Sequence, residues 1–145
     1  MLFKRISRTA PEQIFVVVKN VSGGTLTSGY SCAWDLSAVD GVRVTQAATA
    51  FLQAYAGVAD ADIANNDYGL IQVYGYRSSA YISRSTEAAT AAGVTLEVLT
   101  GNWGLSPVGG AVSLGISKSF AFLCEAVTSS ASASYTTAKV FIRAL

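Results

Sequence analysis

Residues 68–77 read YGLIQVYGYR. Apolar and aromatic side chains alternate here, with Ile71 and Val73 on one face and two tyrosines on the other. A period of two is typical of a β-strand with one buried face. Gly69 and Gly75 interrupt the pattern, as expected at a bulge or where another backbone segment approaches closely. The segment therefore predicts a strand with a special backbone position inside it.

Similar short apolar runs, separated by Gly, Asn, Asp and Ser turns, occur on both sides of this segment. Regular spacing of this kind is typical of an all-β sandwich or barrel. Gln13–Lys19 is a continuous β-branched run, which predicts a strand buried on both faces. The other predicted strands are Tyr30–Ser37, Val42–Ala48, Phe51–Ala59, Ala80–Arg84, Val94–Thr100, Phe120–Val127 and Thr137–Leu145.

Asp40-Gly41 is a hairpin signal that would join the second and third of these runs. Two segments stay open: Ala47–Tyr55 also fits one or two helical turns, and Ser85–Gly93 fits either a short helix or a loop. The last strand is apolar to its end. It must close the chain's own barrel or add to the sheet edge of a neighbour.

The length fits one domain that can bury a core without metal or disulfide support. We therefore expect an all-β fold, a single compact β-barrel or β-sandwich over residues 13–145. Residues 1–12 are expected to form an extended N-terminal arm, and the fold to contain at most one short helix.

The chain is 51% hydrophobic but only 13% charged, against about 25% in a typical soluble domain. A weakly charged surface suits a subunit that packs against neighbours. The formal net charge of +1 gives no global field toward nucleic acid or an acidic membrane, and we expect neither as a partner. Lys4, Arg5 and Arg8 precede the first acid, Glu12, so the arm is either a solvated tail or a protein-docking arm.

The first residues show no secretory signal, because charges occupy the place of the apolar segment that such a signal needs. The longest uncharged stretch, Val98–Ser117, is broken by glycines and a proline and is predicted as turns and short strands. Cys32 and Cys124 are expected to be reduced, buried, small apolar residues, with a disulfide between them as the alternative. Asn20-Val21-Ser22 matches a glycosylation sequon, which we take as a chance match without a secretory route.

The sequence offers little catalytic chemistry. It contains no histidine, the commonest general base and metal ligand, and no nucleophile-elbow, Walker A or dinucleotide-binding motif. The polar cluster at 60–67 has oxygen ligands suited to Ca²⁺, but it departs from the EF-hand pattern and also fits an ordinary turn. We therefore expect no enzyme, no catalytic residues, no metal site and no cofactor.

Four aromatic residues lie in the glycine-punctuated middle of the chain: Tyr74, Tyr76, Tyr81 and Trp103. Such residues are often part of a core. Tyrosine and tryptophan are also enriched at protein interfaces, so subunit contact and ligand contact are the alternatives.

One part of the chain resembles small head proteins of tailed bacteriophages. The resemblance covers roughly residues 56–112 and includes Ala56–Ala59, Asn65–Tyr76, Ala91–Leu96 and Gly104–Pro107. The shared order is a Gly-apolar-Gln-Val-x-Gly strand, an Ala-rich segment that ends in Ala-Gly before a strand, and a Gly-rich return. In the decoration, or cement, proteins of that group this order belongs to a compact β-barrel on the outside of the capsid.

The resemblance implies a structural virion protein that binds the major capsid protein on the head surface and stabilises the shell. It further implies synthesis in the host cytoplasm, a homo-oligomer that is frequently a trimer, and an arm that grips the shell through Lys4, Arg5 and Arg8. Two alternatives stay open. One is another virion part, such as a head–tail connector or tail component, and the other is a carbohydrate-binding surface module that uses the four aromatic residues.

Overall fold

The computed structural model describes residues 2–4, 12–37, 40–84, 89–108, 120–130, 132 and 134–144, with only the backbone described for 2–4 and 51. They form one ten-stranded sheet, which confirms the predicted all-β class. The strands are β1 (Leu2–Lys4), β2 (Gln13–Asn20), β3 (Ser31–Trp34), β4 (Arg43–Thr45), β5 (Tyr55–Ala59), β6 (Tyr68–Arg84), β7 (Thr95–Val98), β8 (Leu105–Pro107), β9 (Ala121–Leu123) and β10 (Ser134–Arg143).

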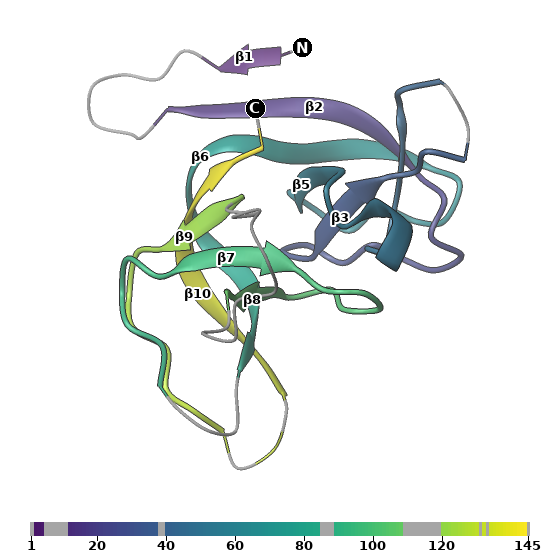
Figure 1. Cartoon of the computed structure of the whole chain (residues 1–145). Helices are drawn as coiled ribbons and strands as arrows, with labels where there is room; N and C mark the ends of the chain where they lie inside the picture. The colour runs from purple at the N-terminus through teal and green to yellow at the C-terminus, as the bar shows by residue number, and fades with distance from the viewer. Residues whose placement is uncertain are drawn as a thin grey trace.

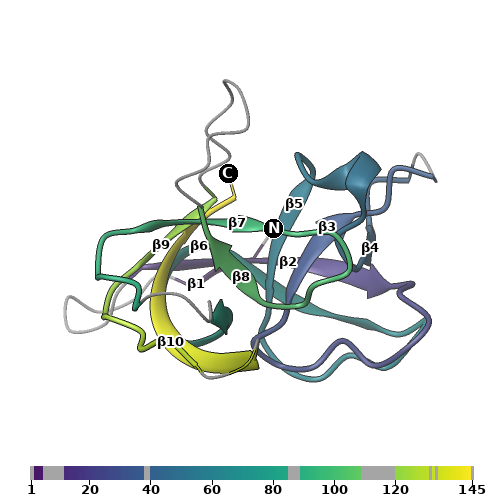
Figure 2. The ribbon, with the colours of Figure 1, turned by 60° about the horizontal axis from the view of Figure 1, so that its bottom comes forward.

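The pairings form two closed circuits that share β6, and the two groups of strands lie on either side of it (Figures 1 and 2). The N-terminal circuit runs β2–β4–β3–β5–β6 and returns to β2. The C-terminal circuit runs β6–β10–β9–β7–β8 and returns to β6 through the single pair Ile82–Leu105. Because the two circuits close, the sheet has few free edge strands. Free edge strands are the usual site at which strands of other chains add to a sheet.

Each circuit surrounds its own apolar core, to which each of its strands contributes. The N-terminal core contains Val18, Leu26, Cys32, Val44, Ala56, Ala59, Ile63, Ile71 and Val73. The C-terminal core is larger and contains Ala33, Ala47, Tyr55, Val58, Ala80, Ile82, Leu96, Val98, Leu105, Ala121, Leu123, Val127, Ala138, Val140 and Ile142.

Strand β5 forms the wall between the two cores. All five of its residues are buried; Tyr55 and Val58 belong to the C-terminal core, and Ala56 and Ala59 belong to the N-terminal core. Its sequence, YAGVA, is rich in small residues, and a Cβ on Gly57 would overlap the backbone carbonyl of Gln72 on β6. A strand packed on both faces at such close range has little room for large side chains.

The sequence predicted that Gln13–Lys19 is buried on both faces, and this prediction is wrong. In β2 only Val18 and Asn20 are fully buried, and Val17 is 56% exposed, so the run Gln13–Lys19 has one solvent-facing side. Conversely, Ser31, Cys32 and Ala33 are all buried in β3, which was predicted to be half-buried. Both differences arise because β3 and β5 lie between two cores, while β2 covers only one.

The predicted strands at 68–77 and Ala80–Arg84 are one continuous strand, β6. Gly75, at its centre, is paired with Gln13 on one side and Ile142 on the other. Its φ is +100°, and a Cβ there would overlap the carbonyl oxygen of Glu12. Only glycine fits this left-handed backbone and close approach, as the sequence predicted.

Part of the predicted N-terminal arm is strand β1, which pairs antiparallel with the start of β2 (Figure 1). At the other end of the chain, β10 pairs with β6 and β9. Of the alternatives for the last strand, the structure therefore shows closure of the chain's own sheet.

The hairpin predicted at Asp40-Gly41 is present, with β3 and β4 antiparallel. Residues 49–51 form a single 3₁₀ turn before β5, so both the helical and the strand predictions hold for parts of that segment. Ser85–Gly93 lies partly outside the described residues, and Thr90 there bridges to Val127. Within the described ranges, no helix is long and apolar enough to cross a membrane.

Candidate interaction surface

The predicted arm residues are placed only in part. Lys4 lies opposite Gln13 in the β1–β2 pairing, so its backbone belongs to the sheet. Arg5 and Arg8 lie outside the described residues. The docking role predicted for these three cations stays a prediction.

The four predicted aromatic residues fall into two groups. Tyr81 and Trp103 both contact Tyr30, at ring-centroid distances of 5.0 Å and 5.3 Å. Tyr74 instead contacts Phe141 at 5.3 Å, and Phe141 lies opposite Tyr76 in the β6–β10 pairing. No ring contact between described residues joins the two groups.

We call the first group the junction cluster; it consists of Tyr30, Tyr81, Trp103 and Tyr135. Tyr30 and Trp103 stack at an interplanar angle of 15°, and Tyr81 meets both Tyr30 and Tyr135 edge to face. Sequence reasoning missed Tyr30 and Tyr135, because each reaches the cluster through tertiary contacts. The only available signal was that both are aromatic and border predicted strands.

The backbone holds the junction cluster in place. The carbonyl of Trp103 accepts hydrogen bonds from the Ser31 backbone N–H at 2.8 Å and the Ser31 hydroxyl at 2.9 Å. The Tyr81 N–H donates to the Gly29 carbonyl at 2.9 Å. The cluster therefore ties β3, β6 and the loop between β7 and β8 together.

The second group lies on the outward face of β6, β9 and β10. Phe141 stacks on Phe122 at 5.2 Å and 10°, and Tyr74 meets Phe141 edge to face. Along β10 the buried residues Val140 and Ile142 alternate with it, which places Phe141 on the side away from the core. These rings are partly exposed, so they form an apolar strip on the sheet surface.

The polar cluster at 60–67 is structural. Asp62 accepts the Ser28 N–H at 2.7 Å, Asn65 accepts the Gly23 N–H at 3.0 Å, and Asp60 pairs with Arg77 at 3.3 Å. These bonds join the loop to the preceding turn and to β6, as ordinary turn chemistry does. In the described part of the chain, no group of three or more His, Cys, Asp or Glu could hold a metal ion.

Asn20 anchors the same loops from inside. It is fully buried, and its Nδ2 donates to the carbonyls of Gly24 at 2.7 Å and Ile63 at 2.8 Å. Its Oδ1 accepts the Ser22 N–H at 2.9 Å. Because Asn20 is buried and both its amide nitrogen and its amide oxygen are hydrogen-bonded, this asparagine of the sequon cannot accept a glycan in the folded protein.

Arg77 explains why β6 continues through its polar middle. The guanidinium is nine-tenths buried and donates to the carbonyls of Ser79 and Ala59, each at 2.8 Å, as well as to Asp60. A buried arginine is tolerated when its donors are satisfied in this way. Next to it is a cavity of about 180 Å³, lined in part by buried Gln72, whose Oε1 finds no hydrogen-bond partner among the described residues.

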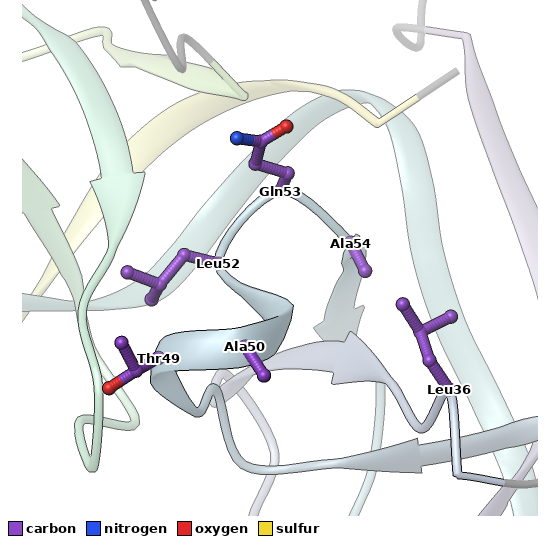
Figure 3. A pocket seen from close by; sticks show the side chains of 6 residues that line it. All are labelled: Leu36, Thr49, Ala50, Leu52, Gln53 and Ala54. Carbon is purple, nitrogen blue, oxygen red and sulfur yellow. The ribbon is translucent and has the colours of Figure 1, made fainter.

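A second, shallow pocket of about 390 Å³ lies beside the 3₁₀ turn. Figure 3 shows the side chains of Ala54 and of Leu36, on the β3–β4 connection, directed toward one another. The six lining residues are Leu36, Thr49, Ala50, Leu52, Gln53 and Ala54. None carries an ionisable side chain, so the pocket supplies no general acid or base.

The two cysteines have different environments. Cys32 is buried, and desolvation raises the pKa of its thiol to about 12. Cys124 is exposed, which contradicts the prediction that both are buried. Both are free thiols, so of the two alternatives the reduced form holds.

No protein-family model matches the sequence, and no curated protein is significantly similar to it. The fold is similar to that of the N base of head fiber gp8.5 of bacteriophage phi29. The TM-score is 0.52, and the alignment covers 91% of this chain and 95% of that chain. The sequence identity is 13%, so the likeness is one of fold.

Proposed function

We propose that the chain is a structural protein of a phage virion, a capsid decoration protein that binds the outer surface of the head and stabilises the shell. The observation that carries the proposal is the likeness to a head fiber base over nearly the full length of both chains. The likeness between residues 56–112 and small phage head proteins points to the same part of the virion.

The physical properties of the chain are consistent with this role. A decoration protein needs binding surfaces and no reaction chemistry, and this chain has few charges and no histidine. It carries a partly exposed aromatic strip and several exposed apolar side chains, the residue types enriched in interface centres. The partner would be the major capsid protein, and the protein itself would be a homo-oligomer, with a trimer as the first expectation.

Light scattering on the purified protein, followed by sedimentation with heads of the phage that encodes it, tests the proposal. We expect a monomer or small oligomer that sediments with heads at a saturable stoichiometry and raises their disruption temperature. A variant with Lys4, Arg5 and Arg8 replaced by Ala should bind more weakly. The matched control replaces Lys19 and Arg43, two exposed or partly exposed cations of β2 and β4.

A protein that ignores heads contradicts the proposal. Ring formation in isolation would favour a connector or tail subunit, the other virion role predicted from the sequence. If heads are bound equally well by the arm variant and the wild type, the virion role stands and the arm is not its contact.

A further inference from the structure

The junction cluster faces outward from the C-terminal core. Tyr81 lies between Ala80 and Ile82, both fully buried, so its side chain is on the opposite face of β6. On β10, Thr137 lies opposite Tyr81 and Tyr135 lies opposite Ser83. Tyr135 is 42% exposed and Thr137 is exposed as well. The cluster therefore presents the ring of Tyr135 at the sheet surface, with the rings of Tyr30, Tyr81 and Trp103 partly buried.

The rings are fixed before any ligand arrives. The Cδ1–Cε1 edge of Tyr135 lies against Gly104, where a Cβ would come within 2.8 Å and 2.9 Å of these atoms. Tyr81 lies against Gly29 in the same way, at 3.0 Å. Each ring also contacts at least one other ring of the cluster. A surface of rings that is already ordered loses little side-chain entropy on binding.

Neutral polar groups surround the rings. The Asn102 amide donates to the Ser83 hydroxyl at 3.4 Å, and Asn102 Oδ1 accepts the Gly104 N–H at 2.8 Å. Among the hydrogen bonds of the described residues, none uses the hydroxyl of Tyr30, Tyr81 or Tyr135. These groups can therefore donate to and accept from a ligand. Every side chain named in this surface is uncharged.

This combination selects one ligand chemistry. A pyranose ring has an apolar C–H face that packs on an aromatic ring, and a rim of hydroxyls that needs neutral donors and acceptors. The absence of charge among these side chains disfavours phosphate, nucleic acid or a carboxylate-rich peptide, since those ligands require Arg or Lys contacts.

We propose that Tyr135, Tyr81, Trp103 and Tyr30, with Ser83, Asn102 and Thr137, form a binding surface for a neutral oligosaccharide. Tyr135 provides the exposed ring, Tyr81 and the Tyr30–Trp103 stack support it, and the polar residues bind sugar hydroxyls. The carbohydrate alternative predicted from the sequence named Tyr74 and Tyr76 as well, and the ring contacts place these elsewhere. The proposal does not depend on the virion role.

Fluorescence titration tests the site, because the chain has only two tryptophans. A Trp34→Phe background leaves Trp103 as the reporter. Maltohexaose, cellohexaose and chitohexaose are the probes, and calorimetry on the same samples provides a second readout. We expect a saturable change in Trp103 emission with at least one of them, at a Kd of about 1 mM or tighter.

Tyr135→Ala should weaken that binding about tenfold, which corresponds to about 1.4 kcal/mol. Tyr135→Phe keeps the ring and should lose less. Tyr68→Ala is the matched control, because Tyr68 is 62% exposed but lies at the far end of β6 beside Lys19. It should leave binding unchanged.

Two results would overturn the proposal. One is no emission or heat signal with any of the three sugars at about 10 mM, well above the expected Kd. The other is binding that Tyr135→Ala and Tyr68→Ala affect equally. Circular dichroism of each variant must match the wild type, and if Tyr135→Ala does not fold, Thr137→Ala and Tyr135→Phe provide the same comparison. Head binding is measured separately, so a failure here leaves the virion role standing.

Discussion

Among the described residues, the N-terminal circuit has nine buried apolar residues in its core and the C-terminal circuit fifteen, although each consists of five strands. In the smaller circuit, buried or loop-spanning polar side chains supply long-range contacts: Asn20, Asp62, Asn65 and Arg77 all bind distant backbone or side-chain atoms. In the larger one, apolar side chains from every strand meet directly. The smaller circuit buries too little apolar area to be stable by that means alone. Hydrogen bonds to buried partners therefore contribute a larger share of its stability.

The largest effect should come from the residue that the two circuits share. Gly75→Ala puts a Cβ onto the Glu12 carbonyl and forces alanine into φ +100°. We expect a loss of more than about 4 kcal/mol, the range of exceptional single mutations, so that the chain no longer folds. Gly41→Ala is the control, because Gly41 has φ +67° but nothing within 4 Å of a Cβ. It should cost only about 1–2 kcal/mol; equal losses in urea unfolding would show that the close approach is unimportant.

The next effect tests the apolar character of the C-terminal circuit. Leu96→Ala empties a site that is fully buried in the larger core. The expected loss is about 2–5 kcal/mol in the free energy of unfolding. Val18→Ala in the smaller core removes less carbon and should cost less. A loss below about 1 kcal/mol for Leu96→Ala would contradict the assignment of this core as the main source of stability.

Asn20→Asp tests the polar character of the N-terminal circuit without changing side-chain size. It removes both Nδ2 hydrogen bonds and sets a carboxylate oxygen against the carbonyls of Gly24 and Ile63. The cost of leaving buried groups unpaired is about 1–3 kcal/mol. Alkylation of Cys32 measures the local part of this cost, since its thiol is buried in the same core. Labelling of Cys32 should accelerate in the variant, whereas labelling of exposed Cys124 should not change.

The smallest effect concerns an exposed polar contact of the C-terminal circuit. Lys139 is skipped in the β6–β10 register, and its N–H donates to Glu125 at 2.9 Å, with the ammonium 3.0 Å from the other carboxylate oxygen. The backbone N–H bond, followed by the Lys139 side chain, lowers the pKa of Glu125. The carboxylate therefore stabilises the fold above its unfolded-state pKa, and this contribution is lost as pH falls through the lowered value.

Lys139 changes in the opposite direction, because Glu125 raises the pKa of its ammonium. That contribution is present below the unfolded-state pKa and is lost as pH rises through the raised value. Glu125→Gln keeps an acceptor for the N–H but removes the charge, so it should flatten both limbs of a plot of Tm against pH. An unchanged acid limb in the variant would show that other carboxylates cause it.

Local pattern predicted most strands because their alternation faces a single core. Val140 and Ile142 against Phe141, or Leu96 and Val98 against Glu97, have the burial that period two predicts. The pattern failed where burial depends on the other circuit. Nothing local in YAGVA distinguishes a strand between two cores from a half-exposed one.

Two further features, the continuity of β6 and the full set of clustered aromatic residues, could not be predicted because they also depend on contacts between distant parts of the chain. The predicted strands at 68–77 and Ala80–Arg84 left Ser78 and Ser79 between them, but β6 is continuous there, and Arg77 is held by the carbonyl of Ala59 and the side chain of Asp60. At the candidate surface, Tyr81 and Trp103 were identified, whereas Tyr30 and Tyr135 were not; both contact Tyr81, from which they lie 51 and 54 residues away along the chain. Such contacts are set by the pairing of the whole sheet and not by spacing.

The shared strand β6 also sets an order of events during synthesis. Every strand pairing that closes the N-terminal circuit lies within residues 13–75, so this circuit can form before residues 76–145 have left the ribosome. The faces of β3 and β5 that belong to the C-terminal core then stay exposed to solvent until β10 pairs along β6. Nascent chains that stall before β10 would therefore present an apolar surface, which makes the final strand the step at which chaperone contact ends.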